Sequence, residues 1–240
     1  IKRASEPLAK NGSAALWDIG DGVVCLEYTS KMNAMDPDIL ALMREAVDIV
    51  KRGYKALVLH NEGENYSVGA NLGLLLFAAN IGTWDQIEEM VEAGQESYRA
   101  LKYAPFPVVG APSGMALGGG CETLLHCDAI QAHAETYIGL VEVGVGLVPG
   151  WGGCKEMLQR WITHKHRPGG PMPAVIKCFE TISTATVAKS AAEAKDYLFF
   201  LQDDGISMNR DRLLADAKAR ALAMATDYQP PQPIEISLPG

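Results

Sequence analysis

The chain has 240 residues, enough for one large domain, and its 48% apolar and 21% charged content is that of a globular protein rather than a disordered one. A formal net charge of -8 argues against nucleic acid or an anionic membrane as the main partner, although a phosphate-bearing ligand needs only local N–H donors and positive charge. No apolar run reaches 18 residues, so we expect no membrane span.

The first half of the chain alternates strand and helix patterns. Residues 1–13 are polar and irregular, and we expect them to form a linker. Strands are expected at 14–19, 23–28 and 55–60, the first two joined into a hairpin by Gly20-Asp21-Gly22. Helices are expected from an Asp36 N-cap to Gly53, over 72–79, and from a Thr83 N-cap to Tyr103, with Ile87, Met90, Val91 and Leu101 on the buried side of the last.

The second half continues the pattern and then becomes helical. Strands are expected at 108–111, 128–132 and 136–139, and helices at 118–126, 174–184, 190–199 and 210–226. This order predicts an α/β fold. We divide it into a linker (1–13), a core (14–161), a basic loop with C-terminal helices (162–228) and a proline-rich, extended tail (229–240). The two ends, Ile1 and Leu238-Pro239-Gly240, indicate a piece of a longer protein.

The cysteines indicate a reducing compartment. Cys25, Cys121, Cys127, Cys154 and Cys178 are odd in number and scattered, with no CxxC pair. The chain also lacks the basic-then-apolar pattern of a secretory signal. We therefore expect a cytoplasmic location.

Three consecutive glycines, Gly118-Gly119-Gly120, precede Glu122 at the expected start of a helix. Glycine costs a helix about 1 kcal/mol relative to alanine, so the run indicates close approach to something bound, although a tight strand-to-helix turn would use glycine as well. A dinucleotide fingerprint fails, because the spacing from Gly144 meets Pro149 where the last glycine is needed. There is no phosphate-binding loop, and Ser113 does not stand in a G-x-S-x-G elbow.

Glu122 and Glu142 are the candidate acid and base. A single Glu is most often a solvated surface charge. Glu142, however, has the most apolar surroundings of any carboxylate in the chain, between Gly139-Leu140-Val141 and Val143-Gly144-Val145-Gly146-Leu147. Burial there would raise its pKa toward that of a general acid, and two carboxylates in different environments can divide acid and base roles.

The segment Tyr66–Leu72 is a loop that enters a helix. Asn71 is the expected N-cap of that helix. The backbone N–H of Ala70 is also a candidate donor aimed at the same ligand atom as the N–H of Gly119. Two convergent N–H groups form an oxyanion hole, where losing one donor costs roughly 3 kcal/mol of transition-state stabilisation.

The histidines do not indicate a metal site. His164 and His166 form an HxH pair in the basic loop, but no Cys, Asp or Glu stands at ligand spacing from them. His60, His126 and His133 fall on core-like segments, where a histidine is usually a packing residue. We therefore predict no metal.

Several motifs together resemble the crotonase (enoyl-CoA hydratase/isomerase) superfamily. They are Ser67-Val68-Gly69-Ala70-Asn71, Gly118-Gly119-Gly120-Cys121-Glu122 and Val141–Gly153, which occur in the expected order and separation over about residues 16–161. Lys31-Met32-Asn33-Ala34-Met35, Leu101-Lys102-Tyr103-Ala104-Pro105 and Asn209–Lys218 narrow the resemblance to the hydratase module of bacterial bifunctional 3-hydroxyacyl-CoA dehydrogenase/enoyl-CoA hydratase proteins.

The resemblance implies a spiral of ββα units with a C-terminal helical region, assembled as homotrimers. It also implies addition of water to a trans-2-enoyl-CoA to give 3-hydroxyacyl-CoA in fatty acid β-oxidation. The N–H groups of Ala70 and Gly119 would hold the thioester oxygen. Glu122 would orient and deprotonate the water, and Glu142 would deliver a proton to Cα.

The resemblance implies a path for the acyl-CoA substrate as well. The residues that would line it are Lys31, Asn33, Ala34, Val68, Asn71, Leu72 and Gly144. Asn71 stands where many relatives have Asp, and Trp151 and Cys154 replace a small residue and a threonine. No cofactor is expected in this chain, because NAD would belong to a separate dehydrogenase module whose dinucleotide fingerprint is absent here.

Two other functions remain open at this stage. A Δ3,Δ2-enoyl-CoA isomerase would use the same oxyanion hole with one dominant acid/base. A catalytically silent module would bind acyl-CoA or assemble with a fused partner. The presence of both Glu122 and Glu142 favours the hydratase.

Overall fold

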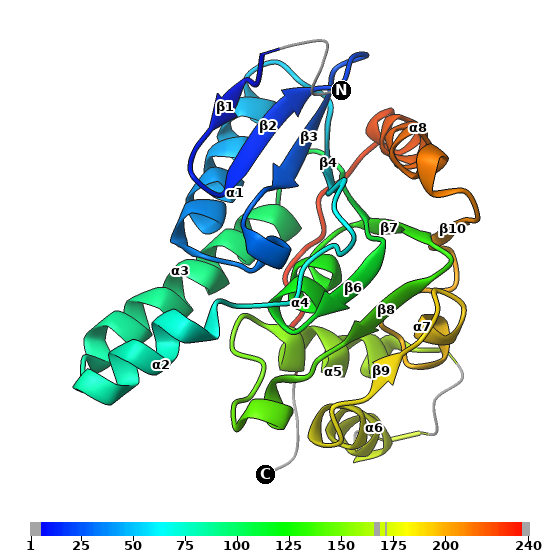
Figure 1. Cartoon of the computed structure of the whole chain (residues 1–240). Helices are drawn as coiled ribbons and strands as arrows, with labels where there is room; N and C mark the ends of the chain where they lie inside the picture. Colours follow the sequence, from blue (N-terminus) through cyan, green and yellow to red (C-terminus); the bar gives the residue numbers. More distant parts are fainter. Residues whose placement is uncertain (1–5, 166–168, 171, 237–240) are drawn as a thin grey trace.

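In the computed structural model, which describes residues 6–165, 169–170 and 172–236, a seven-stranded sheet runs through the centre of the fold (Figure 1). Its order is β1-β2-β3-β4-β5-β7-β10; β1, β2 and β3 pair antiparallel, and the pairs from β3 onward are parallel. The strands are β1 (Ala9–Lys10), β2 (Ala14–Asp18), β3 (Val23–Tyr28), β4 (Ala56–His60), β5 (Val108–Ala111), β7 (Ala129–His133) and β10 (Gly205–Ser207).

A second sheet of three short strands lies beside the first. In it β6 (Gly114–Leu117) pairs parallel with β8 (Thr136–Gly139), and β8 pairs antiparallel with β9 (Val187–Ala188). Strand β6 leads directly into α4 (Gly119–Leu125). The small sheet therefore fixes the start of the helix that carries Glu122.

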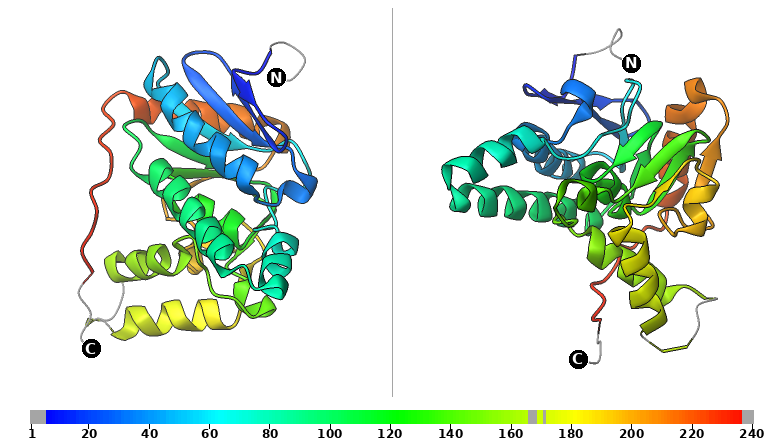
Figure 2. Two further views of the ribbon diagram at one scale, coloured as in Figure 1. Left: turned by 90° about the vertical axis from the view of Figure 1, so that its left-hand side faces the viewer. Right: turned by 60° about the horizontal axis from the view of Figure 1, so that its bottom comes forward.

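Helix α1 (Pro37–Lys51) covers one face of the large sheet and α8 (Leu213–Ala225) covers the other (Figure 2). The other helices are α2 (Leu72–Ile81), α3 (Trp84–Lys102), α5 (Gly153–Thr163), α6 (Met172–Ser183) and α7 (Glu193–Asp196), with 3-10 turns η1 (Lys31–Asn33), η2 (Glu142–Val145) and η3 (Arg210–Arg212).

Alternation along the strands divides the core in two. Successive side chains of a strand point to opposite faces. Leu57 and Leu59 of β4 therefore join the larger cluster, which includes the buried side of α1, while Ala56 and Val58 join a smaller cluster under α8. This explains why every residue of β4 is buried and why the strand is apolar from Ala56 to Leu59.

Helices α2 and α3 form an arm that projects from the rest of the fold (Figures 1 and 2). Gly82, in the left-handed region at φ 72°, ends α2 and turns the chain into α3. Helix α2 is apolar on all sides, yet Ala78 is its one fully buried residue. Helix α2 is therefore not part of the core, although it is apolar, and its residues Leu72 and Leu75 face the pocket described below.

The structure confirms most of the elements expected up to residue 139. The hairpin of β2 and β3 forms at Gly20-Asp21-Gly22, and Asp36 caps α1 by accepting a 2.9 Å hydrogen bond from the N–H of Ile39. Thr83 occupies the N-cap position of α3 but makes no side-chain capping bond. Its hydroxyl donates instead to the carbonyl of Ala78, which ties the turn to α2.

Other expectations were wrong. The expected linker contains β1, which pairs with β2. The predicted helix over 190–199 is reduced to the four residues of α7, and the predicted helix over 210–226 begins with the 3-10 turn η3. Strand β6 was not predicted. Residues 1–5, 166–168 and 171 (in the linker and basic loop), and 237–240 of the tail, lie outside the described residues.

Within the described ranges, no helix is both long and apolar enough to cross a membrane.

We expect the Asp36→Ala variant to lower the free energy of unfolding by about 1–2 kcal/mol, because it removes the capping bond to Ile39 and a second hydrogen bond from Ser13. Urea denaturation measures the loss. Thr83→Ala is the matched control, since it changes a cap position without a capping bond, and should cost less than half as much. Equal losses would contradict this interpretation of the two caps.

Candidate active site

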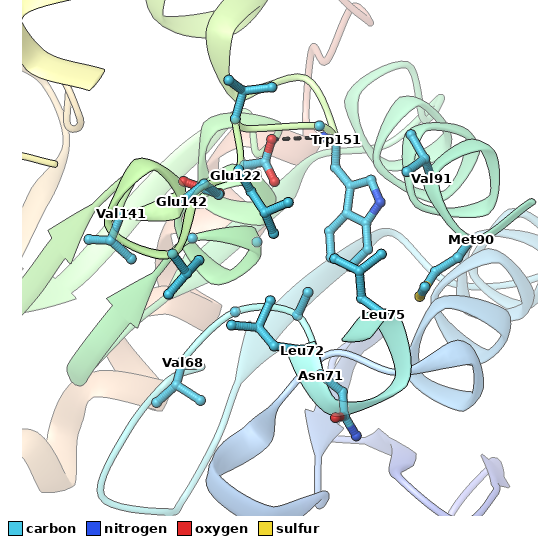
Figure 3. A pocket seen from close by; sticks show the side chains of 18 of the residues that line it. Val68, Asn71, Leu72, Leu75, Met90, Val91, Glu122, Val141, Glu142 and Trp151 are labelled. Carbon is cyan, nitrogen blue, oxygen red and sulfur yellow. Dashed lines mark hydrogen bonds between the residues drawn. The ribbon is translucent and has the colours of Figure 1, made fainter. Parts of the chain in front are cut away.

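A cavity of about 520 Å³ lies between the arm and the start of α4 (Figure 3). Its apolar walls are Val68, Leu72, Leu75, Ile87, Met90, Val91, Val141, Val145, Leu147, Val148 and Trp151. Ala70, Gly119, Glu122 and Glu142 face the same space. An apolar pocket with a few convergent polar groups has the character of a small-molecule site.

The loop that carries Ala70 is fixed on both sides by backbone pairing. On one side the Ser67 N–H donates to the carbonyl of Met115, and the Leu117 N–H donates to the carbonyl of Ser67, both at 2.9 Å. On the other side the Asn71 N–H donates to the carbonyl of Met35 at 2.9 Å. In the resulting bridge between Met35 and Ala70, the N–H of Ala70 points away from Met35.

Glycine is required at Gly119 and Gly120 by close contacts within the protein, and at Gly118 by the backbone conformation. A Cβ atom at Gly119 would lie 2.7 Å from the Trp151 ring, and one at Gly120 would lie 2.7 Å from Cβ of Ser67. Gly118 has φ 53°, in the region that favours glycine, and a Cβ there would meet a Glu142 oxygen at 3.4 Å. The close approach inferred from the sequence is therefore made in part by the chain itself.

Two backbone N–H groups at the pocket have no acceptor in the part of the chain that the structure describes. Gly119 is the first residue of α4, so its N–H has no intrahelical partner. Neither Gly119 nor Ala70 donates its N–H to another of the described residues. The two N–H groups lie near each other. Gly69, the residue before Ala70, is so close to α4 that a Cβ atom built on it would lie 3.3 Å from the nitrogen of Gly119. The arrangement leaves two donors available to a ligand oxygen.

Glu122 is buried and held in place. Its Oε1 accepts hydrogen bonds from the N–H groups of Trp151 at 2.9 Å and Gly153 at 2.8 Å, and its side chain is only 2% exposed (Figure 3). Burial raises the pKa of Glu122 to about 8, and the charge of Glu142 adds to the increase, while the two N–H donors limit it. Its carboxyl group is therefore fixed in direction and poised to exchange a proton.

Glu142 lies at the start of η2, and its carboxyl group has different surroundings from that of Glu122. Both of its carboxyl oxygens are buried, and neither has a hydrogen-bond partner among the described residues. Burial raises the pKa of Glu142. An unpaired buried carboxyl group is costly, so its retention points to a partner that arrives with a ligand.

The predicted substrate residues divide into two groups. Val68, Asn71 and Leu72 line the cavity, and the Asn71 side chain caps α2 by accepting from the N–H of Gly73 at 3.2 Å. Lys31, Asn33, Ala34 and Gly144 do not line it. The Asn33 side chain is committed to the carbonyl of Asn65 at 2.8 Å. Gly144 is exposed on η2.

Sequence reasoning missed much of the apolar wall. Ile87, Met90 and Val91 were assigned to the buried side of α3, but they are half-buried and face the cavity. Leu75 and Trp151 were not assigned to the site. The uniformly apolar sequence of α2 was the available signal, since a helix without a polar face must cover something on more than one side.

Among the described residues, no group of three or more His, Cys, Asp or Glu side chains is arranged to hold a metal ion. His60 and His126 are buried, and each has its Nδ1 hydrogen-bonded to a backbone carbonyl, that of Ala111 and that of Glu122 respectively.

A model of the enoyl-CoA hydratase/isomerase family matches residues 20–167, which contain the whole candidate site. The chain belongs to this family. Among solved structures, an enoyl-CoA hydratase from Bacillus anthracis superposes with a TM-score of 0.73 at 23% identity, covering 90% of this chain and 78% of that one. A putative enoyl-CoA hydratase from Streptomyces coelicolor A3(2) gives 0.75 at 20% identity, covering 93% and 77%. The fold is therefore the crotonase fold.

The chain is also similar to parts of longer proteins. A probable 3-hydroxyacyl-CoA dehydrogenase of Bacillus subtilis is 42% identical over 241 residues, which span 100% of this chain and 30% of the relative. A putative fatty acid oxidation complex trifunctional enzyme of Rickettsia felis is 38% identical over 160 residues, which span 67% of this chain and 22% of the relative. The chain thus spans less than a third of these relatives.

The Glu122→Gln variant should change how stability depends on pH. The folded-state pKa of about 8 exceeds the ordinary value of 4.5, so the stability contributed by protonated Glu122 is fully present below about pH 4.5 and is lost as pH rises through about 8. The glutamine side chain of the variant carries no charge at any pH, so the variant does not lose stability in this way. Its free energy of unfolding, relative to the parent, should therefore rise between pH 5 and 8 and then level off. Urea denaturation across pH 5–9 measures the difference, and a constant difference would contradict the assignment.

Proposed function

We propose that the chain is an enoyl-CoA hydratase module, which adds water in syn fashion to a trans-2-enoyl-CoA to give 3-hydroxyacyl-CoA. The observation that carries the proposal is the pair of dissimilar carboxyl groups, Glu122 and Glu142, facing one apolar cavity beside two unpaired N–H donors. Adding water to a conjugated thioester requires a group to activate the water, a group to protonate Cα, and stabilisation of the enolate oxygen.

The N–H groups of Ala70 and Gly119 would bind the thioester oxygen. Charge develops on this oxygen as water attacks Cβ, and two backbone donors in an apolar cavity stabilise it without reorganising. The rigid pairing of Ser67 with β6 and of Met35 with Ala70 supports this role, because it fixes one donor relative to the other.

The two carboxyl groups would divide the proton transfers. Two buried carboxyl groups that repel each other favour a state in which one of them carries a proton. The N–H donors on Oε1 favour the charged form of Glu122, whereas Glu142 has no such donors. The reactive form would be the one in which Glu122 is charged and Glu142 is protonated, and its share grows as pH rises toward the Glu122 pKa of about 8. In that form Glu122 would accept a proton from the attacking water, and Glu142 would deliver its proton to Cα.

The coenzyme A part of the substrate would follow the bridge between Met35 and Ala70 out of the cavity. Lys31, Asn33 and Ala34 lie just before this bridge, and Val68, Asn71 and Leu72 lie at its other end. Gly144 would contribute open backbone near Glu142. We propose no metal or organic cofactor for this reaction.

The wider protein is part of the proposal. The similarity to a protein named as a probable 3-hydroxyacyl-CoA dehydrogenase fits a fused module that oxidises the hydratase product with NAD. A homotrimeric assembly remains a proposal from family resemblance.

A Δ3,Δ2-enoyl-CoA isomerase is the second candidate. It is favoured by the unpaired state of Glu142, because a double-bond shift needs one acid/base that can take and return a proton. An isomerase that uses Glu142 alone does not need Glu122 to be held in a fixed orientation, and we therefore prefer the hydratase.

We expect Glu122→Gln and Glu142→Gln each to lower kcat for hydration of crotonyl-CoA by about 10²–10⁴-fold, the usual contribution of a general acid or base. Loss of ultraviolet absorbance by the conjugated thioester measures the rate. Parental rates in both variants would contradict the assignment. A parent that shifts the double bond of a 3-enoyl-CoA without hydrating crotonyl-CoA, and loses that activity only in Glu142→Gln, would establish the isomerase. A parent with neither activity that still binds acyl-CoA would establish the silent module.

The arm should set the acyl-chain length. Leu75→Ala enlarges the cavity from α2, so we expect kcat/KM for trans-2-octenoyl-CoA relative to crotonyl-CoA to rise roughly three- to tenfold. Leu76→Ala is the matched control, because the neighbouring Leu76 is 65% exposed and does not line the cavity. The same change of ratio in both variants would contradict a pocket role for Leu75.

A further inference from the structure

Three aromatic side chains from separate elements form one buried cluster behind the site. Tyr98 comes from α3, His126 from the end of α4, and Trp151 from the loop before α5. The ring centroids of Tyr98 lie 5.4 Å from those of His126 and 5.6 Å from those of Trp151, the latter in a T-shaped arrangement. All three side chains are buried.

Each residue of the cluster is hydrogen-bonded to the catalytic helix α4, Tyr98 and His126 through their side chains and Trp151 through its backbone. The Tyr98 hydroxyl donates to the carbonyl of Gly119 at 2.8 Å, and the backbone N–H of Trp151 donates to Oε1 of Glu122 at 2.9 Å. Nδ1 of His126 lies 2.7 Å from the carbonyl of Glu122. Because a carbonyl can only accept, Nδ1 carries the proton in either charge state of the ring.

The cluster is itself held from outside. Oε1 of Glu156 lies 3.5 Å from Nε2 of His126, and Lys102 forms an ion pair with the same carboxylate. The Trp151 indole occupies a space that exists because residue 94 is glycine, where a Cβ would come within 2.1 Å of the ring nitrogen. The three rings therefore have little freedom to shift relative to α3 and α5.

Helix α4 needs such support. It has seven residues, fewer than two turns, and helices this short derive their stability from packing. It must nevertheless hold the Gly119 N–H and the Glu122 carboxyl group in fixed relative positions, because small displacements of catalytic groups are costly in rate.

We propose that Tyr98 and His126 are positioning residues, which act through the carbonyls of Gly119 and Glu122 to set the oxyanion donor and the carboxyl group against each other. The inference rests on the proposed function, since it concerns the same two groups. Neither side chain needs to touch the substrate. Thr123 gives the Gly119 carbonyl a second hydroxyl donor at 3.0 Å, so losing Tyr98 should weaken the position of Gly119 without unfolding α4.

The first test is Tyr98→Phe, which deletes one oxygen atom and keeps the ring. We expect kcat for crotonyl-CoA hydration to fall about ten- to a hundredfold while KM changes less than about twofold. Tyr228→Phe is the matched control, because it also removes a 2.8 Å hydroxyl hydrogen bond, to Asp128, outside the residues that line the cavity. Its kcat should equal that of the parent. Thermal unfolding of both variants measures their stability, and a loss of kcat in Tyr98→Phe at the same stability as Tyr228→Phe is an effect on activity alone.

The second test compares two replacements of His126. Leucine fills similar space without a donor, and asparagine can place an N–H near the position of Nδ1. We expect His126→Leu to lose activity and His126→Asn to recover a substantial part of it. If His126→Leu does not fold, the comparison of Tyr98→Phe with Tyr228→Phe decides alone.

The outcomes separate this inference from the proposed function. A parent without hydratase activity would overturn the function, whereas an active parent that loses activity in Glu122→Gln would support it. In that active protein, a Tyr98→Phe variant with parental kcat, or equal losses in Tyr98→Phe and Tyr228→Phe, would overturn the positioning role. So would equal activity of the leucine and asparagine variants of His126.

Discussion

The contact between the loop Ser67–Ala70 and the start of α4 is the constraint on which the site depends. The loop is paired with β6 through Ser67, and β6 continues directly into α4. A Cβ atom at Gly69 would lie 3.0 Å from the carbonyl oxygen of Leu117, and one at Gly120 would lie 2.7 Å from Cβ of Ser67, so larger residues at these positions would force the two segments apart. The spacing of the two N–H groups is therefore a property of the backbone, and it is maintained by the small sheet, which is anchored in the larger core cluster by Ala116, Ile138 and Ala188.

The electrostatics of the cavity follow from that same closeness. Bringing α4 and η2 together buries two carboxyl groups in apolar surroundings, where burial raises the pKa of both and the charge of Glu142 raises that of Glu122 further. Glu122 is compensated by backbone donors that its neighbours Trp151 and Gly153 supply. Glu142 is left without compensation. Burying Glu142 without a hydrogen-bond partner among the described residues costs stability. It also places the two carboxyl groups in different environments, as a site that divides acid and base roles between two carboxyl groups requires.

Local signals in the sequence were sufficient for elements that depend on neighbours in the chain. The Asp36 cap, the glycine turn before β3 and the apolar run of β4 all express short-range preferences, and all were found. Strand β6 was missed because four residues with two small side chains carry no strand pattern, and it forms by pairing with β8 and with the loop at Ser67. The helix expected at 190–199 is likewise shortened to α7, and residues on either side of it bond to distant segments: the Ala191 N–H donates to the carbonyl of Ala134, and the Phe199 carbonyl accepts from Arg160.

The site could be predicted as a set of residues but not as a shape. Glu122, Glu142, Ala70 and Gly119 were identified by motif and do meet at one cavity. The placement of Trp151 could not be foreseen, because it depends on glycines at positions 94 and 119 that become its neighbours only after folding. The carbonyl contacts of Tyr98 and His126 have the same origin in tertiary structure.

Helix α2 forms part of the wall of the pocket without forming part of the core, whereas α3 contributes Tyr98 and Leu101 to the core. No side chain of α2 belongs to either core cluster, although Leu72 and Leu75 form part of the pocket wall. Substitutions in α2 can therefore alter the space available to a substrate while the sheets, α1 and α8 keep their packing. Substitutions that accumulate in this one helix can therefore change the range of substrates that the pocket accepts without lowering the stability of the fold.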